Sequence, residues 1–196
     1  MKEMFYGCTS LTEISFDKFK GQNVSRISRL FSGCSSLTKI SFDQFEGLEI
    51  LDISYLFSNC ISLTSISFSN FNSNSIQNVK GIFYNCFSLI SFDISKLNIS
   101  NADNLSFMFY NCFSLVSLDF KDKDFDTQNI VDMSYMFYNC SALNFLDVTQ
   151  FKTQNVQNME GMFYLCSNLQ SLDLINFDTH NVINMYNMFH NCSLLT

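Results

Sequence analysis

Apolar positions recur along this chain with a fixed period, and the cysteines mark it. They stand at Cys8, Cys34, Cys60, Cys86, Cys112, Cys140, Cys166 and Cys192. The spacing is 26 residues, except for one spacing of 28 that contains a two-residue insertion near 121–124. A fixed period of this size is the signature of stacked structural repeats. The sequence therefore predicts one solenoid over residues 1–196, with about 7.5 repeats of 26 residues.

Two apolar patterns follow one another within each repeat. Val156, Met159 and Met162 recur every three residues, which predicts a short helix with Asn155 as its N-cap. The segment 171–174 alternates polar and apolar residues, which predicts a short strand with Leu172 and Leu174 inward. The expected fold class is an α/β solenoid: a leucine-rich-repeat-like right-handed coil with a parallel β-sheet on one face and short helices on the other.

The position before each cysteine indicates how the predicted helix ends. It holds Gly7, Gly33, Asn59, Asn85, Asn111, Asn139, Leu165 and Asn191. Glycine and asparagine adopt a left-handed backbone at low cost, so we predict a left-handed residue closing each helix. Leu165 departs from this pattern, and we expect a strained or different turn there.

Composition and charge narrow the classes of function. The net charge is −7, with 11 Lys and Arg against 18 Asp and Glu, which argues against nucleic acid and anionic membranes as partners. No apolar run reaches the length of a membrane-spanning helix, so we expect no membrane insertion. The sequence contains no nucleophile elbow, no glycine-rich phosphate loop and no H-E-x-x-H motif. We therefore expect no enzymatic activity and no cofactor.

The cysteine column has three interpretations. Zinc sites normally show C-x-x-C pairs and histidines, whereas the only histidines here are His180 and His190, so we expect no metal site. Neighbouring coils would bring the sulfurs within disulfide range, but parallel side chains point alongside one another. The favoured interpretation is a column of buried free thiols that act as small apolar groups. Disulfides and a metal site are the alternatives.

The outward positions of the predicted strands supply the candidate binding residues, which are Asp93, Asp119, Asp147, Asp173 and Phe145. Stacked carboxylates predict binding of a cation or of a basic patch on a partner protein. The alternative is a solvated strand face on which each Asp forms local hydrogen bonds. A second column contains Tyr6, Tyr84, Tyr110, Tyr138 and Tyr164. It predicts either an exposed contact surface or rings packed flat on the neighbouring coil.

The segments 162–174 and 176–182 carry a resemblance to a known family. They resemble the BspA-like leucine-rich repeat proteins, in the 26-residue form of Mycoplasma and Lactobacillus surface proteins, and the resemblance extends over the whole chain. It implies a cell-surface or secreted protein that attaches to host matrix proteins or neighbouring cells. An intracellular protein-interaction scaffold and a structural spacer are the alternatives, and no site residues carry over.

Apolar residues near both termini suggest that the repeat array continues. Met4, Phe5, Leu194 and Leu195 would be left uncovered, whereas the terminal coils of solenoids normally have polar caps. We expect the sequence to be an excerpt of a longer array. The alternative is end-to-end self-association with other molecules.

Overall fold

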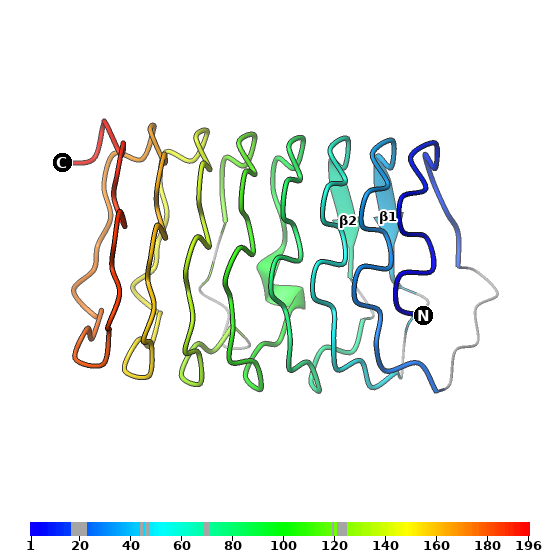
Figure 1. Cartoon of the computed structure of the whole chain (residues 1–196), viewed down its shortest axis with the longest axis horizontal. Coiled ribbons are helices and arrows are strands. Elements are labelled where there is room, and N and C mark those ends of the chain that lie inside the picture. The colour runs from blue at the N-terminus through cyan, green and yellow to red at the C-terminus, as the bar shows by residue number, and fades with distance from the viewer. Residues whose placement is uncertain (17–22, 44, 46–47, 69–70, 119, 121–124) are drawn as a thin grey trace.

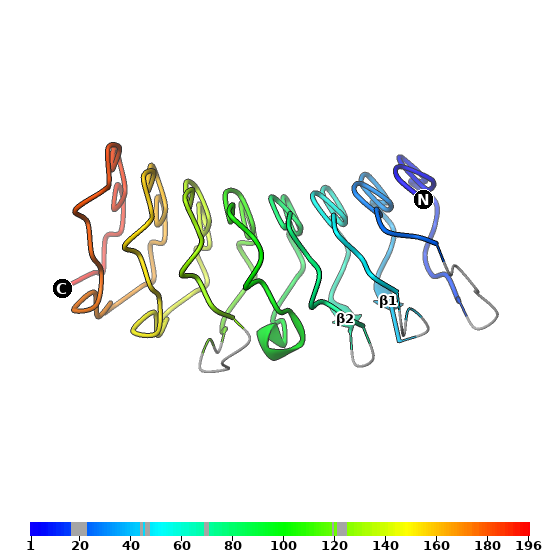
Figure 2. The ribbon, with the colours of Figure 1, turned by 90° about the horizontal axis from the view of Figure 1, so that it is seen from below.

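The computed structural model describes residues 1–196 apart from 17–22, 44, 46–47, 69–70, 119 and 121–124. Successive coils stack along one axis, with the two termini at opposite ends (Figure 1). Seen from below, each coil is a narrow loop beside the next one (Figure 2). This arrangement confirms the prediction of a solenoid. The predicted insertion near 121–124 lies outside the described residues.

One face of the solenoid carries short parallel strands, as predicted. β1 (Lys39–Ser41) pairs with β2 (Ser65–Ser67), so that Ile40 lies opposite Ile66. In later coils the pairing shrinks to single parallel bridges, from Ser91 to Ser117 and from Phe145 to Ser171. A 3-10 helix, η1 (Ile94–Lys96), follows the strand position of one coil. We call the outward side of residues 39–41, 65–67, 91–95, 145–149 and 171–175 the strand face.

The opposite face has no α-helix among its described residues, so the prediction of short helices was wrong. Consecutive turns take their place. The Tyr135 N–H donates to the Glu160 carbonyl oxygen of the next coil at 2.7 Å, whereas the Met136 N–H donates to Met133 in its own coil at 3.3 Å. A helix would direct its interior N–H groups to its own carbonyl groups and leave none for neighbours. We call residues 131–140 and their equivalents in other coils the turn face.

Positive φ angles explain why turns imitate a helical pattern. The residue before each cysteine has positive φ, which confirms the predicted left-handed position, although it closes a turn and not a helix. A second such position lies four residues earlier, where even Tyr55 and Phe107 have φ of 52° and 61°. Type II turns have positive φ at their third residue. Two such turns in succession place apolar residues three to four apart, which matches the spacing of a helix face.

The predicted N-cap residues have a different role. Asn155 donates from Nδ2 to the carbonyl oxygen of Gln128 in the preceding coil, at 2.7 Å. Asn129 bonds to Ser100 in the same way, at 2.8 Å. Because no helix begins here, no helical N–H groups need a cap. The asparagine instead satisfies a carbonyl group of the neighbouring coil, and the prediction of an N-cap was wrong.

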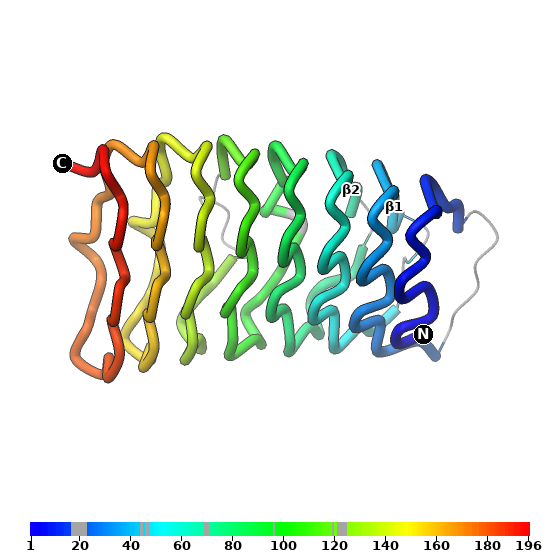
Figure 3. The backbone as a smooth tube through the Cα atoms, turned by 45° about the horizontal axis from the view of Figure 1, so that its top comes forward, coloured from blue at the N-terminus to red at the C-terminus, as the bar shows by residue number. Residues whose placement is uncertain are grey.

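Phenylalanine rings form the centre of the core. The Phe three residues before each cysteine stacks on its equivalents, with ring centroids 5.4 Å apart between Phe83 and Phe109 and 5.6 Å apart between Phe137 and Phe163. Val156, Met159 and Met162 are fully buried, as predicted, whereas Leu172 and Leu174 are only partly buried against the core. Because successive coils follow nearly the same path (Figure 3), each side chain packs against its own equivalent. The period of the sequence thus becomes a set of continuous columns.

Candidate functional site

The cysteines form a buried thiol column, as the sequence predicted, although Cys8 in the first coil is exposed. The Cys112 thiol donates to the carbonyl oxygen of Phe83 and the Cys140 thiol to that of Phe109, both at 3.2 Å. Burial raises the pKa of Cys34 to about 11, and it holds the pKa of Cys112 well above the ordinary thiol value. Thiols that stay protonated are poor nucleophiles and poor metal ligands. This column therefore supports the fold and offers no reactive group in its buried part.

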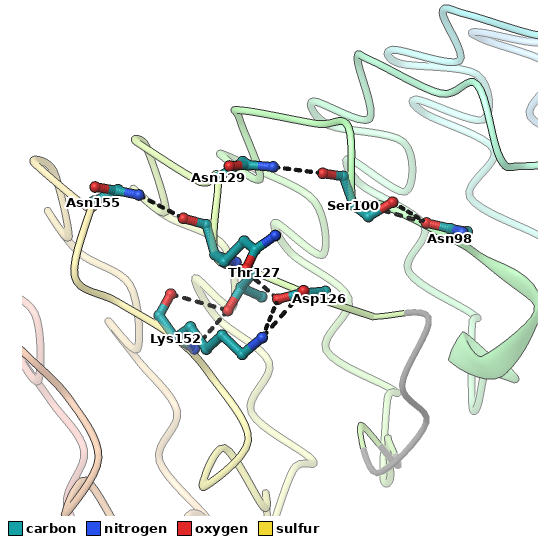
Figure 4. Close-up of polar contacts among 8 residues, drawn as sticks. Asn98, Ser100, Asp126, Thr127, Asn129, Lys152 and Asn155 are labelled. Carbon is teal, nitrogen blue, oxygen red and sulfur yellow. Dashed lines mark hydrogen bonds and ion pairs between the residues drawn. The ribbon is translucent and has the colours of Figure 1, made fainter.

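The repeated Asp-Thr-x-Asn segment also binds coils together (Figure 4). The Thr127 hydroxyl is fully buried, donates to the Lys152 carbonyl oxygen at 3.1 Å and accepts the Lys152 N–H at 2.7 Å. Asp126 accepts the Gln128 N–H and forms an ion pair with the Lys152 ammonium at 3.0 Å. The most recognisable part of the repeat is thus a set of links between neighbouring coils, and not a binding motif.

The predicted tyrosine column is packed. Tyr84, Tyr110, Tyr138 and Tyr164 stack face to face, with centroids 4.4–4.9 Å apart, and His190 continues the stack at 4.7 Å from Tyr164. Tyr6 stays outside this stack and is 63% exposed. Of the two interpretations offered by the sequence, the structure supports rings that lie flat on the neighbouring coil. Their faces are consequently covered, and their edges remain at the surface.

Sequence reasoning found the Asn column before the cysteines but missed its side-chain hydrogen bonds, and it missed a second polar column on the turn face. Asn139 donates to Asn111 at 3.0 Å, Asn111 to Asn85 at 2.9 Å and Asn85 to Asn59 at 2.8 Å, which forms a side-chain amide ladder. A second column, eight residues before each cysteine, accepts the N–H group two residues further on. Its members are Asp52, Asn78, Asn104, Asp132, Asn158 and Asn184. Recurring Asn and Asp eight residues before the cysteines was the signal that could have revealed the second column.

The candidate binding residues lie on the strand face, except that Asp119 is outside the described residues. Asp93 accepts both the N–H and the hydroxyl of Ser95, at 3.2 and 2.6 Å. Asp147 does the same with Thr149, at 3.1 and 2.6 Å, and Asp173 accepts the Ile175 N–H at 3.0 Å. These are Asx turns, which stabilise the local backbone. The local hydrogen bonding matches the alternative interpretation, while Asp93 and Asp173 remain exposed.

Two hollows lie on the strand face, and they differ in character. The first, of about 650 Å³, lies at β1 and β2 and is lined by isoleucine, serine and two charged residues, which are Glu13, Ile14, Ser15, Lys39, Ile40, Ser41, Ser65, Ile66 and Ser67. The second, of about 520 Å³, is lined by aromatic, apolar and acidic residues. They are Phe145, Leu146, Asp147, Thr149, Ser171, Leu172, Asp173 and Thr196. The second hollow therefore brings three of the sequence-predicted residues together: Phe145, Asp147 and Asp173.

Comparison with known proteins decides the family. Residues 1–120 and 113–196 match the family described as "Mycoplasma protein of unknown function, DUF285". The chain belongs to this family. A comparison with functionally curated proteins finds no match. The description of this family assigns no function and names no binding residues.

Solved structures give the fold class independently. The chain is similar to a leucine-rich repeat protein of T. pallidum, with 23% identity, a TM-score of 0.60, and coverage of 94% of this chain and 77% of that one. It is also similar to a leucine-rich repeat protein of Bacteroides ovatus, with 17% identity, a TM-score of 0.46, and coverage of 100% and 68%. At these identities the first likeness establishes the leucine-rich-repeat type of solenoid, and the second carries no further argument.

No group of three or more His, Cys, Asp or Glu side chains in the described part of the chain lies close enough together to hold a metal ion. Asp93, Asp147 and Asp173, the described candidates on the strand face, therefore belong to no such group. No helix among the described residues is long and apolar enough to span a bilayer.

Proposed function

We propose that this chain is a non-catalytic, protein-binding segment of a cell-surface leucine-rich repeat protein, and that the strand face contacts the partner. The observation that carries the proposal is the exposure of Phe145, at 61%, beside the acidic hollow. On the turn face, by contrast, the tyrosine rings are half-buried in a continuous stack. Exposed aromatic side chains rimmed by polar groups are typical of protein contact surfaces.

The chemistry of this hollow indicates the class of partner. Phe145 would enter an apolar site, while Asp147 and Asp173 would lie against Lys or Arg side chains. Attraction between opposite charges mainly accelerates association and sets orientation, whereas the buried aromatic ring supplies most of the affinity. A partner with an apolar patch surrounded by basic residues fits this surface. Host matrix proteins and proteins of neighbouring cells are the sources that we propose.

Binding can be tested with the purified chain and immobilised matrix proteins. The variant Phe145→Ser/Asp147→Asn/Asp173→Asn removes the aromatic ring and two charges but keeps amide oxygens that can accept the Asx-turn hydrogen bonds. We expect binding to fall at least about tenfold, because loss of one aromatic anchor alone costs more than about 1.4 kcal/mol. Asp178→Asn is the matched control, since it removes an exposed charge outside the strand face and preserves its own Asx turn. Equal binding by all of these proteins would refute the assignment of the strand face.

The proposed location has a separate test. Intact source cells are treated with a protease that cannot cross the membrane, and the repeat segment is probed by immunoblot with a cytosolic protein as control. Loss of the segment while the control persists supports surface exposure. Complete protection would favour the intracellular scaffold, which could use the same strand face.

A further inference from the structure

The tyrosine stack places oxidisable groups at contact distance. The rings of Tyr110 and Tyr138 lie 4.4 Å apart and within 7° of parallel. Tyr84 lies 4.7 Å from Tyr110 on one side, and Tyr164 lies 4.9 Å from Tyr138 on the other. Each ring is half-buried, so that one edge of the column meets solvent. Four phenols from four successive coils therefore form one continuous surface column.

The phenols within the column also interact through their polar ends. Burial, the Tyr138 and Tyr84 phenols and a side-chain hydrogen bond with Tyr138 raise the pKa of Tyr110 to about 12. The Tyr110 hydroxyl consequently stays protonated at neutral pH. Tyr6 and Tyr186 differ, because they are 63% and 69% exposed. Neither has a ring contact with another tyrosine among the described residues, which makes them internal controls.

We propose that this column is a site of oxidative cross-linking, at which a peroxidase-type one-electron oxidant joins tyrosines of adjacent coils, first of all Tyr110 with Tyr138. Each phenol loses one electron and one proton and becomes a tyrosyl radical. The two radicals form a carbon–carbon bond between ring carbons ortho to the oxygens. The hydrogen on each of these carbons then moves as a proton to the oxygen of its own ring, which restores both aromatic rings and both hydroxyl groups. The two electrons and two protons removed overall reduce one hydrogen peroxide to two waters.

The fold favours coupling within the chain over coupling between chains. Two radicals held in contact react as if their concentration were far above that of the protein in solution. The two rings must pivot from stacking toward a shared edge, which half-exposed side chains at the surface of the column can do. The new bond would connect residues 28 positions apart in sequence and tie one coil covalently to the next. A cross-link across such a loop restricts the unfolded chain, so the product should resist denaturant better than the untreated protein.

The experiment uses the whole chain, diluted to suppress contact between molecules, with a heme peroxidase and hydrogen peroxide. Peptide mapping by mass spectrometry then locates linked pairs by the loss of two hydrogen atoms. We expect the Tyr110–Tyr138 link to dominate, with Tyr84–Tyr110 and Tyr138–Tyr164 links as lesser products. The yield should be at least about tenfold lower for the same chain unfolded in urea, where the proximity is lost.

Matched variants distinguish cross-linking within the tyrosine column from non-specific oxidation of exposed tyrosines. Tyr110→Phe keeps a stacking ring but removes the oxidisable phenol, so both links to position 110 should disappear while the Tyr138–Tyr164 link remains. Tyr6→Phe removes a more exposed tyrosine and should leave the link pattern unchanged. The proposal is overturned if links through Tyr6 or Tyr186 dominate, if the unfolded chain gives the same yield, or if the rings gain oxygen without forming links.

Discussion

The turn face and the strand face are built from the same repeat but are held in different ways. On the turn face every amide N–H from Met133 to Cys140 donates a hydrogen bond, and every second one, beginning with Met133, donates to the next coil. On the strand face of the same coil, Phe145 forms one parallel bridge with Ser171, and Asp147 accepts the Thr149 N–H in an Asx turn. The comparison teaches that one face supplies cohesion between coils, which leaves outward side chains of the other available for recognition.

The largest expected effect is a loss of folding stability at high pH, to which several thiols of the column behind the turn face contribute together. Burial raises the pKa of each cysteine from Cys34 to Cys166 above the ordinary value of 9.0. The folded state therefore binds these protons more tightly than the unfolded state. This stabilisation is fully present below pH 9 and is lost as the pH rises further, by up to about 1.4 kcal/mol per pH unit for each thiol.

Urea unfolding followed by circular dichroism between pH 7 and 10.5 measures this loss. We expect the unfolding midpoint to fall steeply only above pH 9. Cys112→Ala should make the decline shallower, although it also removes a buried group. An unchanged midpoint up to pH 10.5 would show that the thiols are not buried as described.

Loss of a phenylalanine ring should reduce stability far more in the core behind the turn face than on the surface of the strand face. Phe109→Ala removes a fully buried ring that stacks on two neighbours, and we expect the free energy of unfolding to fall by about 3–5 kcal/mol. Phe145→Ala removes an exposed ring and should change it by less than about 0.5 kcal/mol. Equal losses in urea titrations would contradict the division between the two faces.

Two threonines allow the same comparison for hydrogen bonds. Thr127→Val leaves a fully buried site between coils without its hydroxyl, and we expect a loss of about 1–3 kcal/mol because Lys152 keeps an unsatisfied N–H. Thr149→Val removes a hydroxyl that bonds only locally to Asp147 in a half-exposed turn, and we expect about 0.5 kcal/mol or less. Thermal unfolding of both variants provides the measurement. A larger loss at Thr149 would mean that the Asx turns of the strand face contribute more cohesion than we infer.

The smallest expected effect is an increase in stability, produced by a substitution at Leu165. Leu165 has φ of 61° where the other described coils have Gly or Asn, so its side chain strains the backbone. Leu165→Asn should stabilise the chain by about 0.5–1 kcal/mol, because asparagine tolerates this conformation and adds no cavity at a half-exposed site. Calorimetry should show a higher melting temperature, while Leu169→Asn, in the core, should show a much lower one. A lower melting temperature for Leu165→Asn would show that the leucine contributes packing that outweighs the strain.

The periodic part of the fold could be predicted from the sequence because the same residue types recur at equivalent positions of every coil. The cysteine period predicted the solenoid, and the Gly and Asn column predicted the left-handed position before each cysteine. The prediction of helices failed because Val156, Met159 and Met162 have a spacing that both a helix and consecutive type II turns produce. Apolar spacing alone does not say whether an N–H bonds within its own coil or to the next one.

The candidate site was predicted less fully, for a different physical reason. Outward positions such as Phe145 and Asp173 follow from strand alternation, and the structure places both beside one hollow. The sequence could not show that Asp93 and Asp147 accept local hydroxyl groups, since this depends on turn geometry. Nor could it show that the tyrosine faces are covered, because the stacking depends on how closely the coils approach one another.

Amide hydrogen exchange measured by mass spectrometry tests the central comparison most directly. Peptides covering residues 133–140 and 144–149 report the turn face and the strand face of the same coil. The account predicts that the turn-face amides exchange only through global unfolding, whereas the strand-face amides exchange at least about tenfold faster through local opening. Equal protection of the two peptides, or slower exchange on the strand face, would contradict the claim that the turn face supplies the cohesion of the solenoid.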